Sequence, residues 1–261
     1  MAKEFGEVNL AVADGPDFEK AQELSRRLCL PMVDLLSNDL VENQLLIVAT
    51  ATHVEVREPG LKNSKPIFVD FLAWELARRT QGNRGRNELL AKAAGLGKTD
   101  KVLRILDATA GFGSDAYIFA SLGCEVTMLE RSPVVNVLLE DGLSRLRRIS
   151  GLVAGRMKLV NLDAAVFFRQ LNSQSKLLYD VVYLDPVYPL AKRSSLNRRR
   201  MRVLRSIVGD DLDANELLTQ ALTIARRVVV KRAKNASYLN GIQPSMQFSM
   251  GASVRYDVYF S

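Results

Sequence analysis

The sequence predicts an α/β fold, in which helices cover both faces of a mainly parallel β-sheet and a small α+β subdomain precedes it. Between residues 102 and 231, short apolar stretches alternate with segments of helical spacing. A glycine-containing turn joins the first of these strands to the helix that follows. The chain has 261 residues, 48% of them hydrophobic, which is enough to bury a substantial core. We predict a small subdomain at residues 1–62 and a main domain at residues 63–261.

The predicted small subdomain contains a helix and a hairpin. Residues 17–28 carry apolar side chains at helical spacing, and residues 45–57 alternate as the two strands of a β-hairpin do. Pro59 and Gly60 then break the pattern. No catalytic group of residues stands out here, so we expect a role in packing or in positioning a substrate.

The main domain reads as alternating strands and helices. The predicted strands are residues 103–107, 125–130, 158–162, 179–184 and 227–231. Helices are expected from residues 114, 133, 164 and 213 onward. Two alternating stretches around Gly251 predict an antiparallel hairpin at residues 246–260.

The turn after the first strand is the first candidate binding site, in the segment VLRILDATAGFGSD at residues 102–115. Gly111 and Gly113 let the backbone approach a ligand closely, because neither position has a side chain to fill the space. Gly111-x-Gly113-x-x-Ala116 also satisfies a loose dinucleotide-binding pattern, with Glu130 at about the distance of a ribose-binding acid. A nucleotide-dependent oxidoreductase is therefore one interpretation.

The acidic residues favour S-adenosylmethionine (SAM) as the ligand. Asp107, Glu130, Asp163 and Asp185 follow four predicted strands, and Asp115 lies at a helix start. SAM carries a sulfonium and an ammonium but no phosphate, so carboxylates attract it, whereas they would repel a pyrophosphate. Any one of these carboxylates can also be explained as a helix cap or a solvated charge.

A second motif, Asp185-Pro186-Val187-Tyr188-Pro189, ends the fourth predicted strand. It brings a carboxylate and a stiff turn to the sheet edge where the glycine turn also lies. An exocyclic amine on a planar base is a weak nucleophile that needs aligned acceptors, and Asp185 and the Pro186 carbonyl are suitable. Tyr188 can stack on an extruded base. We therefore predict Asp185, Pro186 and Tyr188 as catalytic residues, although an ordinary strand-to-loop turn would have the same sequence.

The charge favours a polyanionic partner. The net charge is +7 and the pI is about 9.5. Residues 192–205 contain seven basic and no acidic residues, and a second basic group surrounds Gly82 and Gly85. Solvated surface faces would have the same composition. The predicted RNA-binding residues are Arg84, Arg86, Lys192, Arg193, Arg198, Arg199 and Arg200.

Other classes of protein are disfavoured. His53 is the only histidine, and Cys29 and Cys124 lie far apart, so we predict no metal site and expect both thiols to be reduced and buried. No apolar run is long enough to span a membrane, and residues 1–10 lack the apolar core of a signal peptide. We expect a cytoplasmic protein.

Five segments together resemble the bacterial ribosomal RNA small subunit methyltransferase J family. They are DATAGFGSD (107–115), MLERSP (128–133), YLDPVYP (183–189), MRVLRSIVGDDLDA (201–214) and RVVVKR (227–232). The resemblance implies a Rossmann-like class I SAM-dependent methyltransferase fold with a seven-stranded sheet. It also implies methyl transfer from SAM to the N2 amine of a guanine in 16S ribosomal RNA, so that the RNA or the small ribosomal subunit is the partner.

By this resemblance, the cofactor contacts extend beyond the glycine turn. Two positions depart from the family pattern as we know it, since Ser114 stands where a basic residue is expected and Val187 replaces a second proline. An adenine-N6 methyltransferase acting on RNA or DNA and a non-catalytic RNA-binding protein remain alternatives. The full predicted set of cofactor-binding residues is Asp107, Gly111, Gly113, Ser114, Asp115, Glu130, Arg131, Asp163, Ala164 and Asp185.

Overall fold

The structure, a computed structural model, describes residues 9–13, 15–35, 44–59, 64–73, 88–97, 101–171, 178–186, 196–209, 213–249 and 254–261. It divides into two compact units. The first comprises Met1–Asp70, Ser132–Ser144 and Pro189–Gly209, and the second comprises Phe71–Arg131, Arg145–Tyr188 and Asp210–Ser261. Two later segments thus join the N-terminal residues in the first unit, and the domain boundary after residue 62 stays a prediction.

The first unit contains a four-stranded sheet. Its order is β2 (Met32–Val33), β1 (Asn9–Ala13), β3 (Gln44–Ala49) and β4 (Val54–Arg57). The hairpin predicted at residues 45–57 is confirmed, because β3 and β4 pair antiparallel. Strand β1, which was not predicted, pairs parallel with both β2 and β3. Apolar side chains of β1 and β3 form a small buried cluster.

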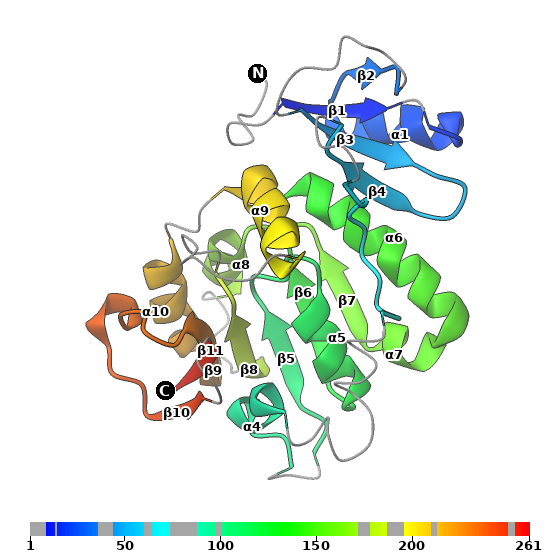
Figure 1. The fold of residues 1–261 in the computed structure, drawn as a ribbon. Coiled ribbons are helices and arrows are strands. Elements are labelled where there is room, and N and C mark those ends of the chain that lie inside the picture. Colours follow the sequence, from blue (N-terminus) through cyan, green and yellow to red (C-terminus); the bar gives the residue numbers. More distant parts are fainter. Residues whose placement is uncertain are drawn as a thin grey trace. The chain divides into compact units, whose positions relative to one another are not determined.

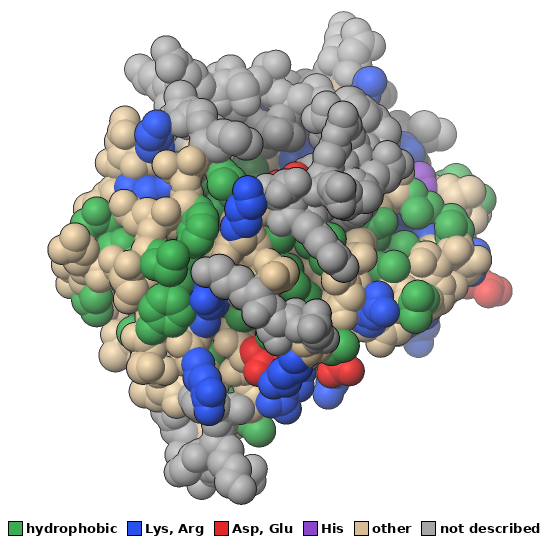
Figure 2. Space-filling model, turned by 90° about the horizontal axis from the view of Figure 1, so that it is seen from below, with side chains coloured by type: hydrophobic (Ala, Val, Ile, Leu, Met, Phe, Trp, Pro, Cys, Tyr) green, Lys and Arg blue, Asp and Glu red, His purple; other side chains and the backbone are tan. Residues whose placement is uncertain are grey.

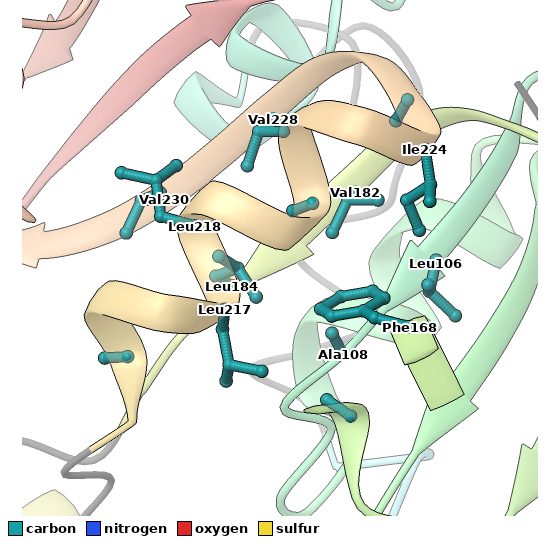
Figure 3. Packing of buried hydrophobic residues seen from close by; sticks show 14 of the residues in the cluster. Leu106, Ala108, Phe168, Val182, Leu184, Leu217, Leu218, Ile224, Val228 and Val230 are labelled. Carbon is teal, nitrogen blue, oxygen red and sulfur yellow. The ribbon is translucent and has the colours of Figure 1, made fainter. Parts of the chain in front are cut away.

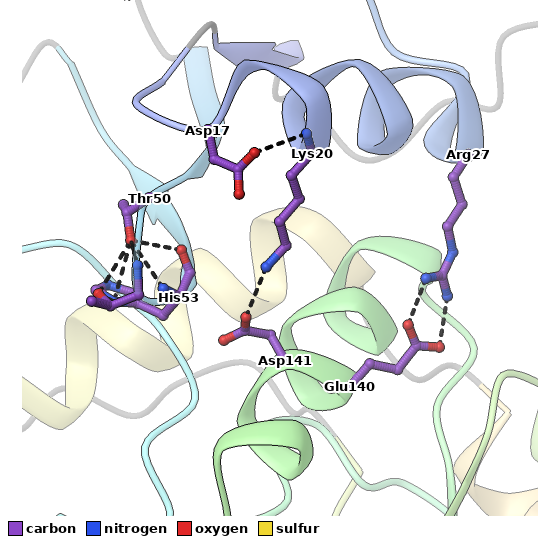
Figure 4. Close-up of polar contacts among 8 residues, drawn as sticks. Asp17, Lys20, Arg27, Thr50, His53, Glu140 and Asp141 are labelled. Carbon is purple, nitrogen blue, oxygen red and sulfur yellow. Dashed lines mark hydrogen bonds and ion pairs between the residues drawn. The ribbon is translucent and has the colours of Figure 1, made fainter.

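Helix α1 (Phe18–Leu28) confirms the predicted N-terminal helix. Asp17 caps it by accepting the backbone N–H of Lys20 at 3.1 Å. Two ion pairs connect α1 to the first part of α6 (Pro133–Ile149), as Figure 4 shows. Lys20 Nζ lies 3.2 Å from Asp141, and the Arg27 guanidinium pairs with Glu140. Most of the basic segment at residues 192–205 lies in a further helix of this unit, α9 (Leu196–Val208). This helix was not predicted.

Cys29 follows α1 with a positive φ of 54°, and its thiol is exposed. The prediction that both cysteines are buried is therefore wrong for Cys29, because the helix ends there and turns the residue outward. It holds for Cys124, which is fully buried.

A seven-stranded sheet forms the centre of the second unit, as predicted (Figure 1). Strands β9, β8, β5, β6 and β7 run parallel, and β11 and β10 complete one edge as an antiparallel hairpin. The order along the sheet is β10 (Met246–Ser249), β11 (Val254–Phe260), β9 (Ala225–Ala233), β8 (Tyr179–Leu184), β5 (Arg104–Asp107), β6 (Glu125–Leu129) and β7 (Met157–Val160).

Helices pack on both faces of this sheet. Phe168 of α8 (Ala164–Leu171) and Leu218 of α10 (Ala214–Ile224) pack against Val182 and other apolar residues of the strands (Figure 3). Tyr183, the next residue along β8, points to the opposite face by strand alternation. Its ring contacts Phe119 of α5 (Ser114–Ser121) edge to face, so α5 covers that other face. Among the described residues, the other helices that lie wholly in this unit are α4 (Leu89–Ala94), α7 (Gly151–Gly155) and the short 3-10 helix η1 (Leu239–Gly241).

The strand order reverses at β5. From this central strand the chain proceeds to β6 and β7 on one side, and then to β8 and β9 on the other. The carboxyl ends of β5 and β8 therefore lie next to each other, with helices leaving to different faces. A crevice at such a reversal is the usual place for a ligand in an open α/β sheet.

Within the described part of the chain, no helix has the length and apolar character needed to cross a membrane.

Candidate active site

The glycine turn after β5 has the backbone that its sequence predicts. Gly111 has a φ of 52° and Gly113 a φ of 71°, which lie in the left-handed region that favours glycine. Helix α5 begins directly afterwards at Ser114. The turn therefore needs glycine at both positions for its shape, which agrees with a backbone that closely surrounds a ligand.

Backbone hydrogen bonds fix this turn to both neighbouring strands. The N–H of Ala108 donates to the carbonyl of Tyr183 at the end of β8, at 3.0 Å. The N–H of Ala110 donates to the carbonyl of Leu129 at the end of β6, also at 3.0 Å. The turn is thus held in place by three adjacent parallel strands.

Glu130, directly after β6, is buried and binds the turn. Its Oε2 accepts the N–H of Gly111 at 3.0 Å, and Asn161 donates to its backbone carbonyl at 2.7 Å. Asp163, after β7, accepts the N–H of Val166 at 3.1 Å and so caps α8. Both carboxylates lie at carboxyl ends of strands, as predicted, and both also have a structural role.

The other predicted cofactor residues lie at the same strand ends. Ser114 starts α5, and Ala164 starts α8 in a buried position. The Arg131 guanidinium lies 3.8 Å from a carboxylate oxygen of Asp213, which precedes α10. Their contacts with a cofactor stay predictions.

The segment that follows β8 meets the glycine turn. The backbone N–H of Asp185 donates to the hydroxyl of Thr109 at 2.6 Å. Asp185 and the turn are 76 positions apart in sequence, so the fold brings the two predicted motifs together at Asp185. Pro186 is buried behind it. Val187, Tyr188 and Pro189 lie outside the described residues.

Lys231, near the end of β9, is a site residue that the sequence analysis missed. Its Nζ donates to Oδ2 of Asp185 at 2.7 Å and to Oδ2 of Asp115 at 2.9 Å. The hydroxyl of Tyr183 donates to the same Asp115 oxygen at 2.6 Å. The signal in the sequence is a lysine near the carboxyl end of a partly apolar strand, which by itself does not distinguish a site residue from a solvated charge.

Burial and mutual repulsion perturb the ionisation of this group. Burial, followed by the charge of Asp115, raises the pKa of Asp107 well above its usual range. Burial also raises the pKa of Asp185, and the Lys231 ammonium opposes that shift. Burial lowers the pKa of Lys231, but Asp115 and Asp185 outweigh it, so the net pKa lies well above the usual value. Lys231 therefore stays an ammonium at neutral pH.

This set of carboxylates fits SAM. Glu130, Asp163 and Asp185 provide carboxylates at the rim of a glycine turn, and oxygen acceptors suit a ligand with two cationic groups and ribose hydroxyls. A redox dinucleotide would bring a pyrophosphate next to the same acids. Among the residues that the structure describes, no group of three or more His, Cys, Asp or Glu side chains could hold a metal ion.

The predicted RNA-binding residues are only partly described. Arg84, Arg86, Lys192 and Arg193 lie outside the described residues, and Arg198 is described only as part of α9. Two arginines of this helix are bound within the first unit, since Arg199 pairs with Glu58 and Arg200 donates to the Phe68 carbonyl at 3.4 Å. Figure 2 shows one face of the molecule, on which Lys and Arg side chains lie among apolar side chains.

Comparisons with known proteins agree with this geometry. A family model that describes SAM-dependent methyltransferases matches residues 32–261. The ribosomal RNA small subunit methyltransferase J of Coxiella burnetii is 41% identical, over 92% of this chain and 91% of its own length. The protein of the same name from Tolumonas auensis is 41% identical, over 95% and 96%.

A crystal structure of a SAM-dependent methyltransferase is also similar to this chain. The SAM-dependent methyltransferase from Neisseria gonorrhoeae superposes with a TM-score of 0.70 at 30% identity, covering 96% of this chain and 95% of that one. The family model covers most of the chain, and the relatives match over nearly their full length. This chain is therefore a SAM-dependent methyltransferase that belongs to the ribosomal RNA small subunit methyltransferase J family.

Proposed function

We propose that this enzyme methylates the exocyclic N2 amine of a guanosine in 16S ribosomal RNA, as free RNA or within the small ribosomal subunit, in the cytoplasm. One observation supports the proposal most strongly. The backbone N–H of Asp185 donates a hydrogen bond to the Thr109 hydroxyl, so Asp185 lies next to the glycine turn. An acceptor for an amine thus lies beside the candidate cofactor site. The names of the relatives supply the class of RNA.

The cofactor side of the site consists of strand-end residues. SAM, when bound, supplies an electrophilic methyl group on a sulfonium. Glu130 would accept the ribose hydroxyls, and its existing bond to the Gly111 N–H would fix its orientation. Asp163 would accept from the adenine amine, at the start of α8. Ser114, at the start of α5, and Arg131, two residues after β6, would also contact the cofactor.

The acceptor side aligns a weak nucleophile. The lone pair of a guanine N2 amine is delocalised into the ring, so the amine must be held with acceptors on its N–H groups. The Asp185 carboxylate and the Pro186 carbonyl would accept these hydrogens, and Tyr188 would stack on the extruded base. Asp185 would also stabilise the positive charge that grows on nitrogen. Since the amine becomes acidic only after alkylation, the proton can leave afterwards, and no histidine base is needed.

Positive charge would hold the RNA. The chain has a net charge of +7, and basic side chains contact phosphates without reading sequence. Arg84, Arg86, Lys192 and Arg193 are the proposed contacts, together with Arg198. Arg199 and Arg200 belong to the same proposed set, but both also have bonds within the first unit, so we expect their substitution to affect folding as well as RNA binding.

The test uses unmodified substrate. Small subunits and free 16S RNA from a strain that lacks the gene are incubated with the protein and SAM labelled in its methyl group. The modified nucleotide is then identified by digestion and mass spectrometry. We expect label on N2 of a guanosine. Label on N6 of an adenine, in RNA or in a parallel DNA reaction, would favour the adenine-N6 alternative, and no label would refute the proposal.

A further inference from the structure

We propose that Lys231 is a positioning residue for methyl transfer. Its ammonium holds the Asp185 carboxylate in the orientation that accepts the target amine and keeps Asp185 ionised beside a second carboxylate, Asp115. The inference rests on the proposed function, because it assigns Lys231 a role through Asp185.

The pairing register of β8 and β9 places Lys231 beside Asp185. Strand β9 pairs parallel with β8, and Leu184 lies opposite Val230, so the next pair in register is Asp185 and Lys231. The ammonium lies 2.7 Å from Asp185 and 2.9 Å from Asp115. The Thr109 hydroxyl fixes the backbone of Asp185, and Lys231 fixes the side chain. Together these contacts leave the carboxylate little freedom to rotate.

The charges around Asp185 require such a cation. Asp115 of α5 raises the pKa of Asp185, and both carboxylates raise the pKa of the buried Asp107 of β5, so this cluster disfavours negative charge. Among the described residues, the hydroxyls of Tyr183 of β8 and Tyr256 of β11 also act on this group. With both Asp115 and Asp185 ionised, one ammonium leaves one net negative charge, which still favours a cationic ligand.

Stability alone does not account for a lysine here, although its side chain is only 26% exposed. Replacing a buried ion pair by apolar residues of similar volume is often neutral or even stabilising, because the desolvation of the charges is costly. Lys231 directly follows three consecutive valines of β9, residues 228–230, and an apolar residue could have continued this run. Its contacts are instead directed at the carboxylate that the proposed chemistry uses.

The test compares wild-type enzyme with the variants Lys231→Met and Lys231→Arg. Methyl transfer to unmodified RNA is measured from pH 6 to pH 10 at saturating SAM. We expect Lys231→Met to lose about 10- to 100-fold in kcat at pH 7, as misplacement of an aligning group does. The acidic limb of its pH profile should move upward, because Asp185 without the cation holds its proton to higher pH. Lys231→Arg should keep a profile close to that of wild type.

A second readout separates this inference from the proposed function. The titration of the Asp185 carboxyl group is followed by carbon-13 NMR in wild type and in Lys231→Met, or in Lys231→Gln if the methionine variant does not fold. We expect a higher midpoint in the variant. An unchanged Asp185 titration, or an unchanged pH profile in a folded variant, would overturn the role of Lys231. Wild-type enzyme that methylates no RNA would instead refute the proposed function, and the NMR titration would still decide on Lys231.

Discussion

Substitution of Asp107 by asparagine should stabilise the protein at neutral pH. The Asp107 side chain is 1% exposed, and its Oδ1 accepts the backbone N–H of Thr109 at 3.2 Å. An asparagine oxygen can accept the same hydrogen. Burial, followed by repulsion from Asp115, raises the pKa of Asp107 well above its usual range, so the folded protein favours the uncharged form. Asparagine supplies an uncharged side chain of the same shape at every pH.

The sign of the pH dependence follows from linkage. A carboxyl group whose pKa is higher in the folded state stabilises the fold below its unfolded pKa of about 3.9 and loses that contribution as the pH rises through the folded pKa. Over each pH unit between the two pKa values, the wild-type protein loses about 1.4 kcal/mol of unfolding free energy. The Asp107→Asn variant avoids this loss. We expect equal stabilities near pH 4 and a growing advantage for the variant toward pH 7, measured by urea unfolding.

Asp180 provides a control of opposite sign. Burial opposes the shift of its pKa, but the Arg104 N–H at 2.8 Å and the Lys101 ammonium at 2.8 Å outweigh it and lower the pKa. Its contribution to stability is present above the unfolded pKa and is lost as the pH falls through the lower, folded pKa. Asp180→Asn should therefore be less stable than wild type at pH 7 and approach it in acid. A pH-independent difference for Asp107→Asn would contradict the raised pKa of Asp107 in the folded protein.

Three further outcomes follow from packing and exposure. Phe168→Ala, at a fully buried position of the main core, should lower the unfolding free energy by about 3–5 kcal/mol in denaturant titrations. Gly142→Ala should also destabilise, because the new Cβ would lie 2.5 Å from a Val69 methyl, and adding Val69→Ala should recover part of the loss. A thiol reagent at pH 8 should label the exposed Cys29 in the folded protein but not Cys124, because burial raises the pKa of Cys124 to about 12, and unfolding should expose both.

Sequence patterns predicted the second unit well because several of its parallel strands contain a short apolar run and end at turn residues. Residues 179–184 match β8 at both ends, and the helix expected from residue 164 onward begins there. The C-terminal hairpin was also predictable, since residues 246–260 alternate on either side of a glycine. Strand β1 was not, because Asn9–Ala13 is short and follows no turn signal. Helix α9 was not predicted, because its many basic residues obscure the helical spacing of the buried Val203, Leu204 and Ile207.

The candidate site was predictable where both the residue type and its position at a strand end or in a turn indicate a role. Strand-end acids and turn glycines carry a local signal, so Glu130, Asp185 and the turn itself were found. Lys231 and Thr109 were not, because their importance comes from partners far away in the sequence. No local pattern indicates that the end of β9 lies beside the end of β8. The oxidoreductase interpretation likewise could not be set aside on the glycine turn alone.

The most direct test of the account is the rate of methyl transfer by an Asp185→Ala variant. The rate is measured in a single turnover on unmodified RNA, with labelled SAM at saturation and with SAM affinity determined separately by calorimetry. We predict a loss of at least about 100-fold in rate, since removal of one preorganised acceptor has effects of that size, while the variant still binds SAM. A near-normal rate in a variant that binds SAM would contradict the role of Asp185 and, with it, the proposed alignment of the amine.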